Sequence, residues 1–289
     1  MKPEWLKTRI PTGQTYFEIK RDLRAKNLHT VCEEAKCPNI TECWATNTAT
    51  FMILGDTCTR ACRFCHVKTG DPKGWLDPHE ADNVADSVVT MKLRYAVITM
   101  VDRDDLADGG AAHSAAVFRR VKERSPETKI EFLAGDFRGL DEPLETVLAS
   151  RVEVFAHNIE TVERLTPRVR DARARYRISL RELQRVKELA TYPVMTKSAI
   201  MLGLGETPAE VVDALKDLRR HDVDLVTLGQ YMRPTRQHLS IKEYVHPNLF
   251  KELGDVALDL GFLAVAAGPL VRSSYKAREF YEQALARRG

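Results

Sequence analysis

Six cysteines lie close together near the start of the chain, and no cysteine occurs after residue 65. They form two groups, which we call the first and the second triad. Structural disulfides would more plausibly join distant parts of a chain, whereas such clustering is typical of sites where thiolates bind zinc or an iron–sulfur cluster. The first triad, with the spacing C-x4-C-x5-C, is Cys32, Cys37 and Cys43, and the second, with the spacing C-x3-C-x2-C, is Cys58, Cys62 and Cys65.

Three cysteines at these spacings suit an iron–sulfur cluster better than a structural zinc ion. Zinc usually takes four tetrahedral ligands, often in closely spaced pairs, and only Cys62 and Cys65 form such a pair. His66 could complete a zinc site, but its position next to Cys65 would strain the geometry. A [4Fe–4S] cluster has four iron corners, so a triad leaves one iron for a substrate, a cofactor or another ligand. The sequence favours clusters and leaves zinc as the alternative.

The composition argues against a nucleic-acid-binding or membrane protein. The chain has 289 residues, of which 44% are hydrophobic and 29% charged, and a net charge of only +3. A nucleic-acid-binding face would need a stronger basic excess, and no apolar run approaches the roughly 18 residues of a membrane span. The first residues, MKPEWLKTRIPTGQ, lack the apolar core of a signal peptide. We therefore expect a cytoplasmic protein with reduced thiols.

Short apolar runs alternate with amphipathic helical stretches along the chain. Most of these runs are continuously apolar, as expected for parallel strands that are covered on both faces. The candidate strands are Thr50–Leu54, Tyr95–Met100, Lys129–Ala134, Val152–Ala156, Val194–Leu202, Leu225–Gly229 and Phe262–Ala266.

Two capping-box signals mark the starts of helices. Ser179 and Glu182 have this spacing at the start of a helix predicted over Ser179–Ala190, and Thr207 and Glu210 repeat it further along. Strands and helices in alternation predict βα units and a parallel sheet.

The number of units predicts an α/β fold built as a partial barrel. Six or seven units suit an open, TIM-like (β/α)6 barrel better than a closed barrel of eight units. We expect three parts: an N-terminal extension over residues 1–49 with the first triad, the barrel over residues 50–266, and a C-terminal helical segment over residues 267–289.

The motifs resemble those of the radical S-adenosylmethionine (SAM) superfamily, and of the lipoyl synthase family within it. The motif C-x3-C-x-aromatic-C follows the first strand, with Phe64 before its third cysteine, and the upstream triad is similar to that of lipoyl synthases. Both triads together with RSSY near the end of the chain are very specific. Further segments match the family in order: LHTVCEEAKCPNITECW, VDRDDLADGGA, HNIETV, TKSAIMLGLGET, LGQYMRP and AGPLVRSSY.

The resemblance implies two [4Fe–4S] clusters with different roles. The cluster of the second triad would bind SAM at its open iron, and one electron would cleave SAM to a 5′-deoxyadenosyl radical. The auxiliary cluster of the first triad would supply sulfur and be consumed. In the family a serine of RSSY is its fourth ligand, which points to Ser274, with Ser273 as the neighbouring alternative. Sulfur would enter at C6 and C8 of an octanoyl group linked to a lysine.

The resemblance also implies partners. The substrate would be an octanoylated lipoyl carrier domain, such as the E2 subunit of a 2-oxoacid dehydrogenase or the H protein of glycine cleavage. A ferredoxin- or flavodoxin-type donor would supply electrons, and an iron–sulfur carrier would rebuild the consumed cluster. We expect a monomer, because a folded carrier docks most easily on one. Another radical SAM sulfur-inserting enzyme and a non-catalytic metal-binding scaffold are the alternatives.

A loop over residues 101–110 follows the second candidate strand and is a candidate cofactor cradle. It ends in Gly-Gly and holds four aspartates and an arginine. A solvated turn is the simpler interpretation. The position at the carboxyl end of a strand favours contacts to SAM instead, because barrels place their chemistry there. We select Asp102, Arg103 and Asp104, and Phe64 of the cysteine motif, as cofactor-binding residues.

His157, Asn158 and Glu160 follow the fourth candidate strand in the same way. A lone histidine is more often structural, but beside Asn158 and Glu160 we expect hydrogen bonds to SAM. Ser179 is predicted mainly as a helix cap, with a SAM contact as its second role.

We interpret three further features of the sequence. The segment GLGE, residues 203–206, lacks the third glycine of a dinucleotide fingerprint and reads as a tight turn. The arginines of residues 164–177 are most simply a solvated face, although they could hold the SAM carboxylate or an acidic carrier. His66 departs from the family pattern, and we hypothesise that it modulates the nearby cluster.

Overall fold

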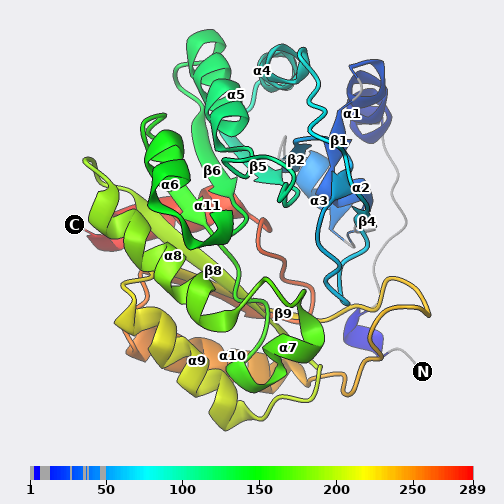
Figure 1. Cartoon of the computed structure of the whole chain (residues 1–289). Helices are drawn as coiled ribbons and strands as arrows, with labels where there is room; N and C mark the ends of the chain where they lie inside the picture. Colours follow the sequence, from blue (N-terminus) through cyan, green and yellow to red (C-terminus); the bar gives the residue numbers. More distant parts are fainter. Residues whose placement is uncertain are drawn as a thin grey trace.

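The computed structural model describes residues 3–6, 14–26, 28–34, 37, 39–45 and 50–288. Its centre is a curved sheet with helices on its outer face (Figure 1). In the described residues the sheet has eight strands in the order β1-β2-β5-β6-β7-β8-β9-β10. These are β1 (His29–Thr30), β2 (Thr50–Ile53), β5 (Tyr95–Met100), β6 (Lys129–Leu133), β7 (Val154–Ala156), β8 (Met195–Leu202), β9 (Leu225–Gln230) and β10 (Ala264–Gly268).

The parallel part of the sheet confirms the predicted α/β barrel class. Strands β2 and β5 to β10 pair in parallel, and only β1 joins its neighbour β2 in the antiparallel sense. All seven candidate strands are present, with ends that shift by one or two residues. The terminal strands β1 and β10 do not pair with each other, so the barrel is open. The division into three parts stays a prediction, although β1 of the extension is part of the same sheet.

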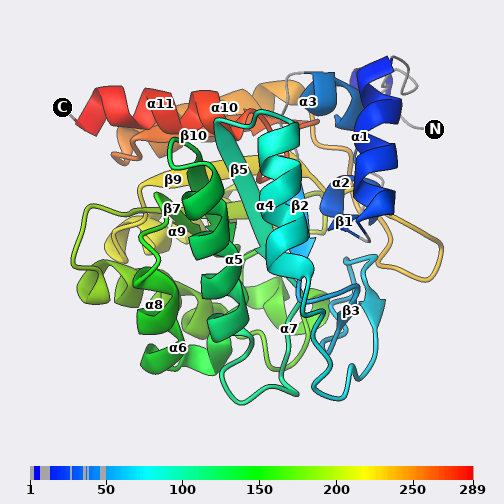
Figure 2. The ribbon, with the colours of Figure 1, turned by 90° about the horizontal axis from the view of Figure 1, so that it is seen from above.

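Helices cover the outer face of the sheet, as expected for βα units. The longer ones alternate with the parallel strands (Figure 2). They are α4 (Glu80–Thr90), α5 (Ala111–Arg124), α6 (Asp141–Leu148), α8 (Tyr176–Leu189), α9 (Pro208–Arg220) and α10 (Pro247–Asp259). Near the N-terminus lie α1 (Gln14–Ala25), α2 (Val31–Glu34) and α3 (Ile40–Ala45), after the short η1 (Glu4–Leu6). None of the described helices combines the length and apolar character that a membrane crossing requires.

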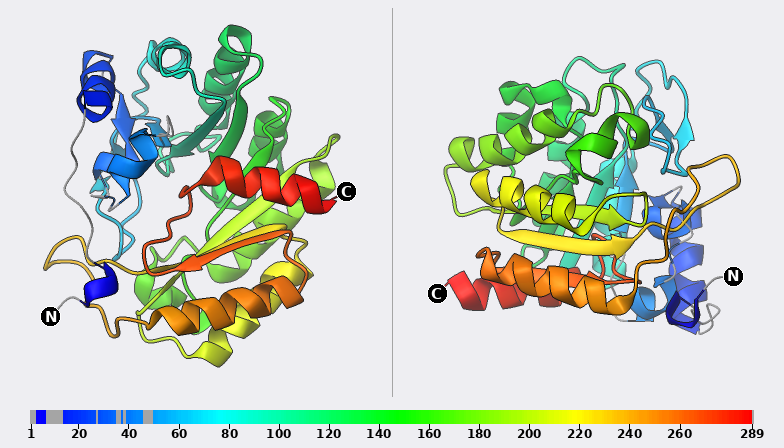
Figure 3. Two further views of the ribbon diagram at one scale, coloured as in Figure 1. Left: turned by 180° about the vertical axis from the view of Figure 1, so that it is seen from behind. Right: turned by 90° about the horizontal axis from the view of Figure 1, so that it is seen from below.

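The last helix, α11 (Ala277–Arg288), crosses the opposite, inner face of the sheet (Figure 3). Phe280 and Ala284 pack there against Val154 of β7 and Leu225 of β9. Beneath the helix, Lys197 Nζ donates to Glu131 Oε1 at 2.7 Å, and both side chains are buried. The C-terminal helix therefore covers the inner face of the open barrel, and the residues that precede this helix must run along the sheet.

The two capping predictions have different outcomes. Thr207 and Glu210 form a full capping box at the start of α9, as predicted. The prediction for Ser179 and Glu182 is wrong, because α8 begins three residues earlier at Tyr176. Ser179 is thereby placed inside the helix, on the face that the barrel buries.

Gly229 allows the C-terminal segment to approach the sheet. A Cβ atom at this position of β9 would lie 2.2 Å from the carbonyl oxygen of Val271, which precedes the RSSY sequence. Backbone atoms cannot yield as a flexible side chain does. The close approach therefore depends on the missing side chain.

We predict that Gly229→Ala lowers the free energy of unfolding by about 1–3 kcal/mol, because the methyl group overpacks a backbone contact. Urea unfolding of the metal-free chain measures this. Gly268→Ala is the matched control, since a Cβ there meets only Val271 Cγ2, at 3.4 Å. Equal stability of the two variants would contradict the prediction.

Candidate functional site

The second triad lies in the loop that follows β2. Cys58 ends the short strand β3 (Thr57–Cys58), which pairs with β4 (Lys68–Thr69) across the base of the loop. Two backbone N–H groups donate to sulfur atoms of the second triad. The backbone nitrogen of Arg60 lies 3.4 Å from Cys58 Sγ, and that of Asp171 lies 3.3 Å from Cys62 Sγ. Donors of this kind favour the thiolate form that binds metal.

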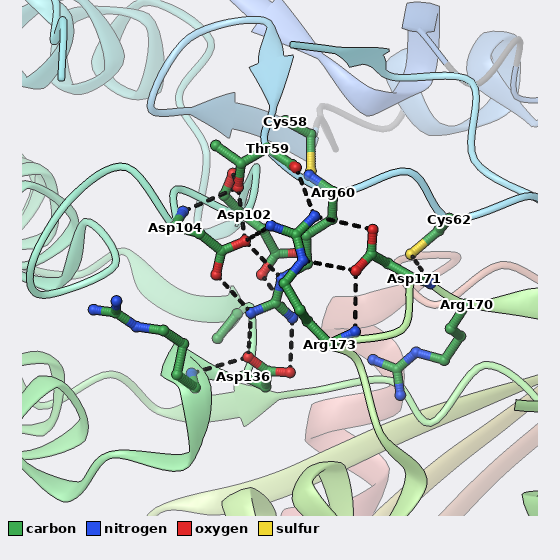
Figure 4. A network of polar contacts seen from close by, with 12 residues as sticks. Cys58, Thr59, Arg60, Cys62, Asp102, Asp104, Asp136, Arg170, Asp171 and Arg173 are labelled. Carbon is green, nitrogen blue, oxygen red and sulfur yellow. Dashed lines mark hydrogen bonds and ion pairs between the residues drawn. The ribbon is translucent and has the colours of Figure 1, made fainter. Parts of the chain in front are cut away.

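Arg60, between the first two cysteines of the second triad, anchors this loop to the barrel (Figure 4). Its guanidinium is bound bidentately by Asp136, at 2.7 Å on both sides, and again by Asp104, at 3.0 Å. Asp102 follows at 3.6 Å. Burial alone would lower the pKa of Arg60, but the hydrogen bonds to Asp136 and Asp104 raise it. The arginine is 4% exposed and charged. It joins the cysteine loop to the ends of β5 and β6.

A second, more exposed pair closes the loop from the other side. The Arg173 guanidinium binds Asp171, Asp104 and the carbonyl oxygen of Thr59. Asp171 in turn accepts from the backbone N–H of Ala61 at 2.9 Å. The hydrogen bonds of Arg173 hold the pKa of Asp171 below its usual value. The loop between Cys58 and Cys62 is therefore fixed on both sides before any metal binds.

His157, Ser179 and Arg170 form a buried chain of hydrogen bonds beside the loop. His157 Nδ1 lies 3.0 Å from the carbonyl oxygen of Ala134, so Nδ1 carries the proton and Nε2 accepts from the Ser179 hydroxyl at 2.8 Å. Ser179 Oγ accepts in turn from Arg170 Nη1 at 2.7 Å. Burial lowers the pKa of His157 to about 4, with help from Arg170, so the imidazole is neutral.

This chain corrects two predictions. We expected His157 to form hydrogen bonds with SAM. Both of its ring nitrogens have protein partners instead. Ser179 does not cap α8, and its hydroxyl is engaged by His157 and Arg170, so its predicted SAM contact stays a prediction. The chain of hydrogen bonds orients Arg170. Burial raises the pKa of the Cys62 thiol, and the positive charge of Arg170 opposes that rise. Arg170 thus departs from the solvated face predicted for the basic run.

Polar groups without partners gather around the second triad. Of the buried side-chain atoms without a hydrogen-bond partner in the described structure, Asn158 Oδ1 and Arg170 Nε belong to residues near this triad. Asn158 donates to Glu160 Oε1 at 3.1 Å. Burial raises the pKa of Glu160 and raises that of Asp102 to about 6. Unsatisfied buried groups are uncommon and point to a missing ligand.

The other predicted cofactor residues have structural partners. Arg103 is 1% exposed, and its guanidinium binds Asp105 and the carbonyl oxygens of Leu54 and Trp75. It shapes the loop, and its geometry gives no support to the predicted SAM contact. Asp104 is likewise occupied by Arg60 and Arg173. Phe64 is partly buried and packs on the main core.

The first triad lines a separate pocket. The residues around it come from both ends of the chain, and they include Ser274 but not Ser273. They are Cys32, Cys37, Asn39, Cys43, Thr50, Arg272, Ser274 and Tyr275.

Polar contacts hold the two ends of the chain together at this pocket. Asn39 Nδ2 donates to the carbonyl oxygen of Leu270 at 2.7 Å. The Tyr275 hydroxyl donates to Glu42 at 3.1 Å, and Lys276 forms an ion pair with the same carboxylate at 3.5 Å. The segment around Ser274 is therefore positioned against α3, which carries Cys43.

The chemistry of both triads fits a multi-iron group. All six cysteines are free. Burial raises the pKa of each thiol, to about 11 for Cys32 and about 12 for Cys58, so without a cation they are protonated. Metal cations replace such protons. No three His, Cys, Asp or Glu side chains in the described part of the chain converge on a single-ion site.

Comparison with known proteins agrees with this geometry. The family model described as the radical SAM superfamily matches residues 52–218, and that described as the N-terminal domain of lipoyl synthase of the radical SAM family matches residues 1–37. A mitochondrial lipoyl synthase of Schizosaccharomyces pombe is 55% identical over 288 residues, covering 98% of this chain and 78% of that protein. One of Coprinopsis cinerea is 55% identical, covering 96% and 74%.

The chain belongs to the lipoyl synthase family. The predicted enzyme class and radical SAM fold are confirmed with it. Solved structures support the fold alone. The [FeFe]-hydrogenase maturase HydG of Carboxydothermus hydrogenoformans has a TM-score of 0.60 at 11% identity, covering 94% of this chain and 75% of that one. Methylornithine synthase has a TM-score of 0.57 at 13% identity, covering 87% and 70%.

Several residues of this lipoyl synthase site were not singled out from the sequence. Arg60 is one of them. Its position inside the cysteine motif indicated a possible role. Its partner Asp136 is 76 residues away in sequence, so no local pattern connects the two. His66 was noticed, and the structure gives it a contact: its Nδ1 lies 2.8 Å from the carbonyl oxygen of Glu34 on α2. It thereby links the second triad to the helix that carries Cys32.

We predict that Arg60→Gln lowers the free energy of unfolding by about 3–5 kcal/mol, because it leaves the buried Asp136 carboxylate unpaired. Urea unfolding of the metal-free chain measures the loss. Arg177→Gln removes a matched charge from an exposed pair with Glu163 and should cost at most about 1 kcal/mol. Similar losses in the two variants would refute the anchoring role.

Proposed function

We propose that this lipoyl synthase inserts two sulfur atoms, at C6 and C8, into an octanoyl group that is amide-linked to a lysine of a lipoyl carrier domain. The observation that carries the proposal is the pairing of two separate cysteine triads with the serine of RSSY. The second triad follows the carboxyl end of β2, and the first lies in a pocket that Ser274 also lines.

For the second triad, the proposal is a [4Fe–4S] cluster whose fourth iron binds SAM. The polar groups around it suit the methionine part of SAM. The partly buried carboxylates of Asp102 and Glu160 would bind the ammonium group, and Arg170 would bind the carboxylate through the Nε atom that now has no partner in the described structure. Asn158 Oδ1 would accept from a hydroxyl.

For the first triad, the proposal is an auxiliary [4Fe–4S] cluster with Ser274 as its fourth ligand. Support comes from the pocket, which Ser274 lines together with all three cysteines. An alkoxide is a weaker partner for iron than a thiolate, so this corner would release first.

When bound, the cluster of the second triad would supply the electron that cleaves SAM, and the auxiliary cluster of the first triad would supply the sulfur. The chain's own residues bind, orient and enclose these groups. Arg60 holds the cysteine loop at the ends of β5 and β6, and the contacts of Asn39 and Glu42 hold the segment around Ser274 beside the first triad.

The partners and setting proposed are those of the family. An octanoylated carrier, such as an E2 subunit or a glycine cleavage H protein, is the substrate. A ferredoxin or flavodoxin supplies electrons, and an iron–sulfur carrier rebuilds the auxiliary cluster. A monomer in the cytoplasm remains our prediction, while the relatives above are named as mitochondrial proteins.

The test is a single-turnover assay of the anaerobically reconstituted chain with reductant, SAM and an octanoyl-lysine peptide. Because each C–H bond needs one radical, we expect two 5′-deoxyadenosines per peptide and two sulfurs in its mass, once per enzyme. About eight irons per chain should be present beforehand. SAM cleavage without sulfur in the peptide would reject sulfur insertion and favour another radical SAM reaction. Zinc at one or two equivalents per chain would favour the non-catalytic metal-binding scaffold.

A further prediction concerns Ser274→Cys, which should retain the auxiliary cluster more tightly and suppress sulfur transfer, because a fourth thiolate replaces the weaker oxygen ligand. Mass analysis of the peptide and iron release to a chelator measure the two effects. Ser273→Cys is the matched control and should transfer sulfur normally. Undiminished transfer by Ser274→Cys would reject Ser274 as the ligand.

A further inference from the structure

Arg272 is a partly buried cation without a carboxylate hydrogen-bonded to it in the described structure. It lines the pocket of the first triad, and its Nη1 donates to the carbonyl oxygens of Gln230 and Val271 at 3.1 and 2.9 Å. No ion pair joins it to a carboxylate within the described structure, and it shares the pocket with the thiol of Cys37. The nearby Glu42 is bound by Tyr275 and Lys276 instead.

Two arginines that are more deeply buried, Arg60 and Arg103, have carboxylate partners. Arg60 binds Asp104 and Asp136, and Arg103 binds Asp105. A buried guanidinium without a carboxylate is costly unless another anion compensates it. At Arg272, the group that would bring the negative charge is the one that the first triad holds.

We propose that Arg272 is the counter-ion of the auxiliary cluster, raising its reduction potential and retaining it in the pocket. This rests on the proposed function, because a [4Fe–4S] core with three thiolates is a net anion. A positive charge beside it favours the reduced, more negative state. The two carbonyl contacts fix the guanidinium at the pocket wall, so that it can also donate hydrogen bonds to sulfur.

The experiment uses the full-length chain with Cys58→Ala, Cys62→Ala and Cys65→Ala, so that only the auxiliary cluster contributes to the spectrum. In this background Arg272→Gln removes the charge and keeps an amide donor, while Arg272→Lys keeps the charge. Arg278→Gln removes a matched charge from an exposed ion pair with Glu282 on α11. Redox titration followed by electron paramagnetic resonance gives the potential, and a chelator assay gives the rate of iron loss.

We expect Arg272→Gln to lower the potential and to speed iron loss about tenfold or more, as for a lost hydrogen bond to a charged group. Arg272→Lys should lie nearer the parent, and Arg278→Gln should match it. Thermal unfolding separates this role from a structural one. Arg272→Gln should destabilise the cluster-loaded chain but not the metal-free chain, in which the partly buried charge is uncompensated.

Two outcomes would overturn the inference. An unchanged potential in Arg272→Gln, or equal destabilisation of the metal-free and loaded chains, would make Arg272 a structural residue and leave the proposed function intact. A parent chain that binds no iron in this background would overturn the proposed function together with the inference.

Discussion

The buried guanidinium of Arg60 is the interaction on which the cysteine loop depends. A loop that presents three thiolates cannot pack its own core, because the sulfur atoms must stay open toward the metal. In this protein the position of the loop is fixed by ion pairs. Asp136 at the end of β6 and Asp104 beyond β5 enclose one cation from the loop. Such a network rigidifies only when every member is satisfied, and four contacts within 3.0 Å satisfy it.

The second constraint is that the C-terminal segment folds back onto the barrel and the N-terminal helices. Helix α11 packs on the inner face of the sheet, and the segment before it passes β9 at Gly229. Asn39 and Glu42 then hold this segment against the N-terminal helices. The pocket of the first triad therefore exists only when both ends of the chain have folded onto the barrel.

The strands and the triads could be predicted from the sequence because their signals are local. Continuous apolar runs predict buried parallel strands, and cysteine spacing predicts a metal–sulfur site. The start of α8 was missed for a physical reason. Ser179 has the type and spacing of a cap, yet its hydroxyl is needed between His157 and Arg170 inside the barrel. Arg60 and Arg272 have partners that lie far away in sequence, so no local pattern reveals what their charges do.

Particular charged groups beside the two triads suit the proposed uses of these sites, and each site also holds a charge of the other sign, Arg170 beside Cys62 and Glu42 beside Cys43. Around the second triad, the carboxylates of Asp102 and Glu160 act on the Cys65 thiol and raise its pKa beyond the effect of burial. Negative groups there disfavour a further electron on a cluster but suit the ammonium group of SAM. Around the first triad, Arg272 opposes the raised pKa of Cys37. A pocket with a cation favours an anionic core that must stay in place until its sulfur is taken. The same fold thus gives one site an environment for binding an external cation and the other an environment for holding an anion.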